Sequence, residues 1–185
     1  MGFAIAAAAA AAGHEVLLIS GPVSLATPEG VRRVDIETAD ELFHAVESRI
    51  TKVDVAIMAA AVADYRPAQP ASEKIKKEGA AETLTLELVR TRDVLGSARG
   101  LMGFTGTLVG FAAETGDLEA NATKKLHRKG CDLVIANDVS VPGIGFDSDE
   151  NAVLVLRQGA PTISIGKRSK ERLASEIIEL CPAAR

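Results

Sequence analysis

The stretch VDVAIMAAAVADYRP, from Val53 to Pro67, decides how the rest of the chain is interpreted. Its apolar run predicts a long buried strand from Val53 to Val62 at the centre of a parallel sheet. A carboxylate follows at Asp64, and a lysine cluster lies from Lys74 to Lys77. Ligands of open parallel sheets bind beyond the carboxyl ends of the strands, so this order suits a metal-bound polyphosphate. An ordinary strand end followed by a solvated charge run would give the same pattern.

Strand and helix signals alternate on both sides of this stretch. Strands are expected over residues 15–20, 31–37, 83–89, 107–113 and 132–137, with an antiparallel hairpin over 152–157 and 162–165. Helices are expected over residues 3–12, 38–49, 117–129 and 167–180, with a short one from residue 93. The alternation predicts a three-layer, Rossmann-like α/β domain with a mostly parallel sheet and a late antiparallel hairpin. No repeat or linker divides the chain, so residues 1–185 are expected to form a single domain.

Local chemistry predicts where individual helices begin and end. Thr38 and Glu41 form a capping box, in which Thr38 is the N-cap and the Glu41 side chain reaches back. Gly13 and Gly130 follow the ends of two predicted helices, where a left-handed residue is favoured.

The composition restricts the class of protein. Apolar residues make up 47% of the chain but aromatic residues only 3%, so the core is expected to consist of aliphatic side chains. The net charge of −4 argues against a general nucleic-acid binder, which would carry a basic surface. It leaves open the binding of a single nucleotide, because that needs only a local positive pocket.

The cysteines and the alanine run indicate a cytoplasmic protein with no membrane partner. Cys131 and Cys181 lack metal-ligand spacing and lie among apolar residues, which predicts buried, inert thiols in a reducing compartment. The run from Ala6 to Ala12 is too short to span a bilayer, and no basic segment precedes it. Alanine is the best helix former, so this run predicts a helix packed close to the sheet.

Six blocks of the sequence, taken together and in their order, are similar to one known family. They are MGFAIA (residues 1–6), SGPVSL (20–25), AAAVADYRP with EKIKK (59–67 and 73–77), GFAAET (110–115), ANDVS (136–140) and GFDSDEN (145–151). The chain therefore resembles the phosphopantothenoylcysteine synthetase family, the synthetase half of the bifunctional coenzyme A biosynthesis flavoprotein.

The resemblance implies a set of nucleotide-binding residues. They are the backbone of Met58, Ala59 and Ala60 as a wall of the base pocket, then Asp64, Lys74, Arg92, Asp93, Val94, Leu95, Phe111, Lys125 and Lys129. Lys74 matches the catalytic lysine of a loop that closes over the site. Asp64 would hold either a divalent cation or a ribose hydroxyl. The plainer readings are a turn-forming aspartate at Asp64, solvated lysines and a core phenylalanine at Phe111.

For two of these groups a local sequence pattern also indicates a role in binding. Lys125 and Lys129 are four residues apart on a predicted helix, so they share a face, although the helix is basic throughout. The segment from Arg92 to Leu95 opens a helix whose free N–H groups suit phosphate. The resembled family usually has Asn-Pro-Asp here, whereas this chain has Thr91-Arg92-Asp93, so the proline is lost and the aspartate is kept.

The implied activity is the CTP-dependent ligation of cysteine to 4′-phosphopantothenate through an acyl-cytidylate, with Mg²⁺ bridging the triphosphate and no FMN in this domain. The resemblance also implies a homodimer, for which the hairpin from Ala152 to Ile165 offers an edge. A non-catalytic nucleotide-binding domain is the first alternative. An NAD(P)-dependent reductase is the second, and it is disfavoured because the sequence has no GxGxxG and no Tyr-x-x-x-Lys pair.

The start of the chain departs from the family pattern. In the resembled family a strand and a Ser/Asn/Gly-rich loop precede the position of Met1, so the domain is expected to be incomplete at its N-terminus. The expected consequences are an exposed sheet edge, lower stability, and nucleotide binding with impaired amide formation.

Overall fold

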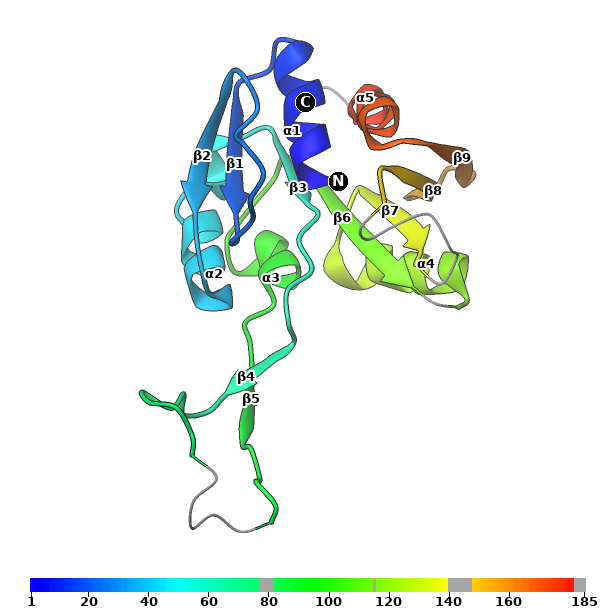
Figure 1. Ribbon diagram of the computed structural model, residues 1–185. Coiled ribbons are helices and arrows are strands. Elements are labelled where there is room, and N and C mark those ends of the chain that lie inside the picture. Colours follow the sequence, from blue (N-terminus) through cyan, green and yellow to red (C-terminus); the bar gives the residue numbers. More distant parts are fainter. Residues whose placement is uncertain (77–81, 115, 140–147, 182–185) are drawn as a thin grey trace.

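Helices and strands alternate along the chain in the computed structural model, which describes residues 1–76, 82–114, 116–139 and 148–181 (Figure 1). The helices are α1 (Gly2–Ala11), α2 (Ala39–Glu47), a short 3₁₀ turn (Ile50–Lys52), α3 (Val94–Gly100), α4 (Leu118–Lys129) and α5 (Lys170–Leu180). The strands are β1 (Val16–Ser20), β2 (Val31–Asp35), β3 (Val55–Met58), β4 (Tyr65–Pro67), β5 (Leu88–Arg90), β6 (Thr107–Glu114), β7 (Leu133–Asp138), β8 (Glu150–Arg157) and β9 (Ile163–Ser169).

The strands form three sheets. The largest has the order β3-β6-β7-β8-β9, in which β3, β6 and β7 are parallel and β8 and β9 are antiparallel. A parallel pair, β1 and β2, and an antiparallel pair, β4 and β5, complete the described strands. The predicted α/β class with a late antiparallel hairpin is therefore confirmed, although the parallel strands are divided between two sheets.

Two layers of helices cover the five-stranded sheet. Leu108 and Ala112 of β6 pack into a cluster with side chains of α2, α3 and α4. Val109, which follows Leu108 directly and points to the other face, packs into a second cluster with side chains of α1 and α5. Successive side chains of a strand point to opposite faces, so the alternation along β6 builds the predicted three layers. The cores contain mainly aliphatic residues, as the composition indicates.

The predicted central strand from Val53 to Val62 is wrong in both length and position. Only Val55–Met58 forms β3, and among the described strands β3 pairs with β6 alone, so it lies at an edge of its sheet. Ala60 and the residues up to Asp64 are exposed and irregular. An apolar run of alanines has weak strand preference, and the run leaves the sheet where pairing with β6 ends.

The predicted helix boundaries are confirmed by their hydrogen bonds. Thr38 Oγ1 accepts from the Glu41 N–H at 3.1 Å, and the Glu41 carboxylate accepts from the Glu37 N–H at 2.7 Å. The side chain thus reaches back one residue beyond the N-cap. Gly13 and Gly130 have φ of +88° and +62°, the left-handed conformation that glycine adopts without strain.

The described residues 65–76 and 82–90, which include β4 and β5, form an arm that projects away from the rest of the protein (Figure 1). The predicted strand over residues 83–89 is reduced to Leu88–Arg90, which pairs with β4. The arm leaves several large apolar side chains exposed; they are Tyr65, Ile75, Leu84, Leu86 and Leu88. A two-stranded ribbon has little core of its own, so its regular part is short.

The cysteines behave as expected of inert thiols. Cys131 is 3% exposed and Cys181 is partly buried, and both are free. Burial raises the pKa of Cys131 to about 11, and burial also raises the pKa of Cys181. Among the described helices, none combines the length and the apolar character needed to cross a membrane.

Candidate functional site

The carboxyl ends of three parallel strands meet at one edge of the large sheet. In the register of β3 and β6, Met58 lies beside Gly110, and in that of β6 and β7, Glu114 lies beside Asp138. Helices α3 and α4 follow β5 and β6 and pack on the same face of this sheet. In open α/β sheets this edge is where ligands bind, so the site is built from the residues that gather here.

Lys125 is the most unusual cation at this edge. Its side chain is half-buried, and its Nζ donates a hydrogen bond to the backbone carbonyl of Phe111. Desolvation by burial lowers the pKa of Lys125, the nearby charge of Lys129 acts in the same direction, and Glu114 opposes both. A half-buried ammonium whose described hydrogen bond goes to a neutral carbonyl is poorly compensated. It is therefore suited to an anionic ligand.

Lys129 lies one helical turn later and has a charged partner. Its ammonium forms an ion pair with the Asp93 carboxylate, and its side chain is only 15% exposed. Asp93 also caps α3, since its Oδ1 accepts from the Gly96 N–H at 2.9 Å. Burial opposes ionisation of Asp93, but the hydrogen bonds from Lys129 and Gly96 outweigh it and lower the pKa of Asp93. One N–H group expected to receive phosphate is thus already used by Asp93.

Burial distinguishes Lys125 and Lys129 from the other basic residues of α4, which form an ordinary exposed surface. Lys124 and Arg128 are exposed, whereas Lys125 and Lys129 are partly buried. The predicted shared face of Lys125 and Lys129 therefore borders the packed face of α4, whose buried residues are Ala122 and Leu126.

The other predicted residues near α3 and β6 have mainly packing contacts. Val94 is 7% exposed in the core on the α3 side. Leu95 lies so close to β6 that a Cβ on Gly110 would be 3.0 Å from its Cδ2. The Phe111 side chain packs with the cluster of α1 and α5 while its carbonyl receives Lys125. Its side chain thus follows the plainer reading of a core phenylalanine, and its carbonyl lies in the site.

The residues after β3 lie between the sheet and the arm. Met58 and Ala59 are partly buried and Ala60 is exposed. Asp64 is exposed, and its carbonyl accepts from the Thr91 N–H at 2.9 Å. Lys74 lies on the arm and is exposed, whereas Lys77 falls outside the described residues. Within the described part of the chain, no hydrogen bond or ion pair joins Asp64 or Lys74 to Lys125 or Lys129.

Arg92 is directed toward α2. Its Nε is 3.3 Å from Asp40 Oδ1 and one of its terminal nitrogens is 2.8 Å from His44 Nε2. The residues of the predicted group at 92–95 therefore face different elements. Asp93 contacts α4, Leu95 contacts β6, and Arg92 contacts α2.

Sequence reasoning assigned no role to Glu114 and Asn121. Asn121 donates to Glu114 Oε2 at 3.3 Å and to the Gly116 carbonyl at 3.0 Å, so it holds the turn between β6 and α4. Asp117 in that turn has φ of +46°, which is uncommon for a residue other than glycine. The sequence signal by which Glu114 could have been found is a carboxylate at the exit of a buried strand.

The described residues provide no ready-made metal centre, since no group of three or more His, Cys, Asp or Glu side chains among them could hold an ion. A magnesium ion that arrives with a polyphosphate needs only one or two protein carboxylates. Asp64 is exposed and fits that limited role.

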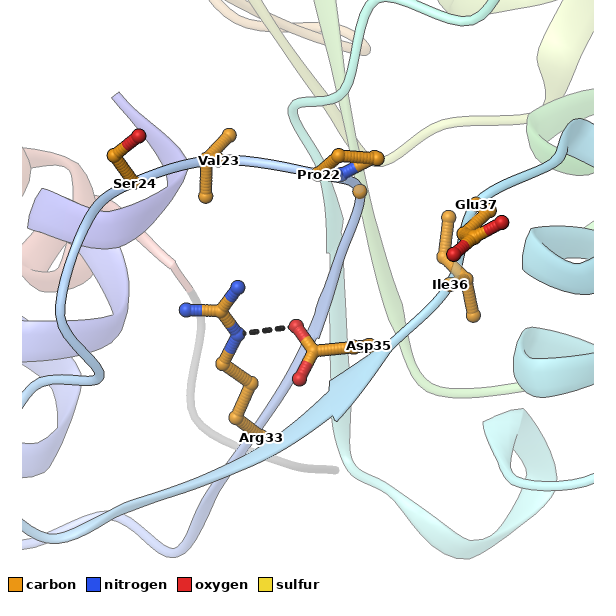
Figure 2. Close-up of a pocket in the computed structure, with 8 residues that line it drawn as sticks. Pro22, Val23, Ser24, Arg33, Asp35, Ile36 and Glu37 are labelled. Atoms are coloured by element: carbon orange, nitrogen blue, oxygen red, sulfur yellow. Dashed lines mark hydrogen bonds and ion pairs between the residues drawn. The ribbon is translucent and has the colours of Figure 1, made fainter.

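A separate hollow of about 490 Å³ lies at the carboxyl ends of β1 and β2 (Figure 2). Pro22, Val23 and Ser24 border it on one side, and Arg33 and Asp35 on the other. Arg33 Nε donates to Asp35 at 2.6 Å, and one of its terminal nitrogens donates to the Leu25 carbonyl at 2.9 Å. These contacts already give the guanidinium a charged partner and a carbonyl partner, and we assign no ligand to this hollow.

Comparison with known proteins identifies the family to which the chain belongs. The model of the family described as the DNA/pantothenate metabolism flavoprotein C-terminal domain matches residues 1–183. The Coenzyme A biosynthesis bifunctional protein CoaBC of Vibrio cholerae is 45% identical over 181 residues, which are 97% of this chain and 45% of that protein. Its counterpart in Escherichia coli is 49% identical over 154 residues, or 83% of this chain and 38% of that protein.

One solved structure gives the same fold at considerable identity. The crystal structure of the C-terminal domain of CoaBC superposes with a TM-score of 0.78 and 36% sequence identity, covering 96% of this chain and 78% of that chain. The chain spans less than half the length of the curated relatives described above.

Proposed function

Because the chain belongs to the family of the DNA/pantothenate metabolism flavoprotein C-terminal domain, we propose that it joins cysteine to 4′-phosphopantothenate at the expense of CTP. The similarity to CoaBC proteins, whose name refers to coenzyme A biosynthesis, supports this assignment. The proposed activity is that of a phosphopantothenate–cysteine ligase, a cytoplasmic enzyme of small-molecule substrates.

The proposed reaction has two steps. The carboxylate of phosphopantothenate attacks the α-phosphate of Mg²⁺–CTP, which forms an acyl-cytidylate and releases pyrophosphate. The amine of cysteine then attacks the acyl carbon and loses a proton, and CMP leaves as the amide forms. The first step is needed because a free carboxylate is a poor acyl donor. The protein's part in such chemistry is largely positioning and charge compensation.

The single observation that carries the proposal is the state of Lys125. Its half-buried ammonium donates to the neutral Phe111 carbonyl, and its pKa is lowered by burial. A phosphate oxygen in place of that carbonyl would add negative charge to that of the nearby Glu114 and form a stronger, charge-assisted hydrogen bond. The binding of a triphosphate at this edge would therefore relieve an unfavourable electrostatic state of the free protein.

Lys129 would contribute through Asp93. In the free protein the ion pair holds the Lys129 ammonium beside the start of α3. The lysine is then already positioned when the nucleotide arrives, and its side chain loses less conformational freedom on binding. Lys125 and Lys129 thus have different roles: one gains a charged partner, and the other is held in place by one.

The arm would complete the site from the other side. Asp64 at its root would bind the magnesium ion or the ribose, and Met58, Ala59 and Ala60 would border the base. Lys74 would then close on the triphosphate, since a compact ammonium on a long stem can follow a charge that is already bound.

We also propose that the protein is a homodimer and that the arm forms the contact. The sequence pattern suggested the hairpin from Ala152 to Ile165, but β8 lies inside the sheet and only β9 offers a free edge there. Leu84, Leu86 and Leu88 alternate on the arm and are 66%, 62% and 50% exposed. Such a projecting apolar surface is typical of a contact between proteins.

The test is a calorimetric titration of the protein with CTP, ATP and NADPH in the presence of Mg²⁺. We expect CTP to bind more tightly than ATP, and NADPH not to bind. Equal binding of CTP and ATP would favour a general nucleotide-binding domain, and preferential binding of NADPH would favour a reductase. Separate assays of pyrophosphate release and of amide formation then test the two steps of the ligation.

A further inference from the structure

Two arginines, one on each side of the base of the arm, meet one carboxylate on α2. Arg66, on β4, has its Nε 3.5 Å from Asp40 Oδ2. Arg92 lies two residues after the end of β5, and its Nε is 3.3 Å from Asp40 Oδ1. Each of the two oxygens of Asp40 thus faces one of the two chain segments that connect the arm to the body of the protein, to which α2 belongs (Figure 1).

Arg92 has two further contacts on α2 that fix its guanidinium. One terminal nitrogen is 2.8 Å from His44 Nε2, and the guanidinium carbon lies 4.0 Å from the centre of the buried Phe43 ring. Arginine has only donors, so His44 Nε2 accepts, and His44 Nδ1 then faces Glu47 Oε2 at 3.3 Å as a donor. Stacking on the ring and the forked hydrogen bonds define the plane of the guanidinium, which a lysine could not do.

Hydrogen bonds at the base of the arm also join its two chain segments to each other. The Thr91 N–H donates to the Asp64 carbonyl at 2.9 Å, and Thr91 Oγ1 donates to the Ala63 carbonyl at 2.6 Å. Thr91 is adjacent to Arg92, so the contacts that hold Arg92 on α2 also restrain, through Thr91, the backbone of Ala63 and Asp64. On its other side Arg92 is adjacent to Asp93, the partner of Lys129.

We propose that Asp40 is a positioning residue that holds the arm, through Arg66 and Arg92, in the orientation in which Asp64 and Lys74 meet the nucleotide. The proposal rests on the function proposed above for Asp64 and Lys74. It assigns Asp40 no contact with the substrate. Its support is the pair of contacts that Asp40 makes with Arg66 and Arg92.

A purely structural role of Asp40 predicts different behaviour. Asp40 lies in the first turn of α2, where a negative charge stabilises the helix whatever the arm does. Its loss would then lower the melting temperature while leaving hydrogen exchange in the arm, and the KM for CTP, unchanged. The two roles are therefore separated by measurements on the arm and not by stability.

The experiment compares wild type with Asp40→Asn, which keeps the shape of the side chain and removes its charge. Hydrogen exchange, followed by mass spectrometry, is measured for segments of the arm and for the five-stranded sheet. We expect exchange in the arm to become faster by about three- to tenfold, the effect of losing two partly exposed ion pairs, with exchange in the sheet unchanged. The KM for CTP should rise by a similar factor while kcat changes little.

Two further variants make the outcome decisive. Arg66→Gln breaks the same pair from the side of the arm, so it should reproduce the faster exchange even if Asp40→Asn folds poorly. Asp35→Asn is the matched control, because Asp35 also accepts from an arginine, Arg33, but lies away from the arm. Unchanged exchange in both test variants, or an equal change in the control, would overturn the proposal. If wild type itself showed no reaction with CTP, the proposed function would fail, whereas the exchange data would still test the restraint of the arm.

Discussion

A Cβ atom on Gly96 would lie only 2.4 Å from Oδ2 of Asp93, the carboxylate that caps α3 and pairs with Lys129. No side chain at position 96 is therefore compatible with the observed cap. Asp93 keeps both of its contacts because residue 96 has no Cβ.

We expect Gly96→Ala to expel Asp93 from the cap and to destabilise the protein by about 0.5–2 kcal/mol, the range for loss of an N-cap. Gly100→Ala is the control on the same helix, since a Cβ there meets nothing within 4 Å. It should be neutral or slightly stabilising, because alanine favours helix over glycine. Urea denaturation of the two variants measures the difference, and equal stabilities would show that the close approach is relieved at no cost.

Removal of either lysine at the site should weaken the binding of CTP. Lys125→Ala and Lys129→Ala each lose a hydrogen bond from a charged donor, so we expect losses of roughly 1–3 kcal/mol in binding free energy. Lys124→Ala is the matched control, because Lys124 is an exposed neighbour on the same helix. Isothermal calorimetry gives the affinities. If neither substitution changed the affinity for CTP, the two lysines would be ordinary solvated surface residues and not part of the site.

The affinity for CTP should depend on pH through Lys125. Burial lowers the pKa of Lys125 in the free protein, and only the protonated lysine can neutralise a phosphate. As the pH rises through this lowered pKa, the free protein loses the proton and binding weakens, below the pH at which an ordinary lysine titrates. Lys125→Arg keeps its charge and should bind with little change over the same range. Dissociation constants from pH 7 to 10 test this, and parallel curves for the two proteins would contradict it.

Arg99 should matter for stability and not for the nucleotide. It donates to the carbonyls of Phe104 and Gly106 at 2.8 Å each, to that of Gly130 at 3.0 Å, and to Asp132 Oδ2 at 2.5 Å. These groups lie at the amino ends of β6 and β7, opposite the candidate site. Arg99→Met should cost about 1–3 kcal/mol, since it leaves the partly buried carbonyls of Phe104 and Gly106 without this donor. Denaturation measures the loss, while the affinity for CTP should stay that of wild type.

The arm should account for self-association. We expect wild type to have the mass of a dimer in light scattering at tens of micromolar. Leu86→Asp should shift it toward the monomer, because a charge replaces an apolar contact. Leu101→Asp is the control, since Leu101 is 71% exposed and lies outside the arm. If wild type were a monomer, or if the two substitutions had equal effects, the proposal that the arm forms the dimer interface would be wrong.

Periodicity and local chemistry were sufficient for the order of the α-helices and of the described strands other than β4, and for several of their ends. The capping box at Thr38 and the left-handed Gly130 need only a few neighbouring residues, so the sequence alone predicts them. The length of β3 does not follow from its apolar run, because a strand lasts only while a partner pairs with it. That partner, β6, is about fifty residues away in the chain.

The candidate site was predicted as a list of residues but not as an arrangement. Lys125 and Lys124 look alike in the sequence, and only packing shows which of them is partly buried. The direction of Arg92 depends on Asp40 and His44, about fifty residues earlier, and no motif connects these positions. The resemblance supplied the positions, and tertiary contacts determine which of them lie in contact, as Lys129 does with Asp93.

The position of β3 at one edge of the large sheet has a consequence for handling the protein. The opposite edge strand, β9, carries Lys167 and Arg168, and charges on an edge strand discourage the pairing of another chain. β3 consists of Val-Ala-Ile-Met and carries no charged side chain. Within the described residues only β6 pairs with it, so its other side presents free backbone donors and acceptors beside apolar side chains. Aggregation during concentration or refolding should therefore start at β3, and a lysine introduced at that strand should suppress it more than one added at β9.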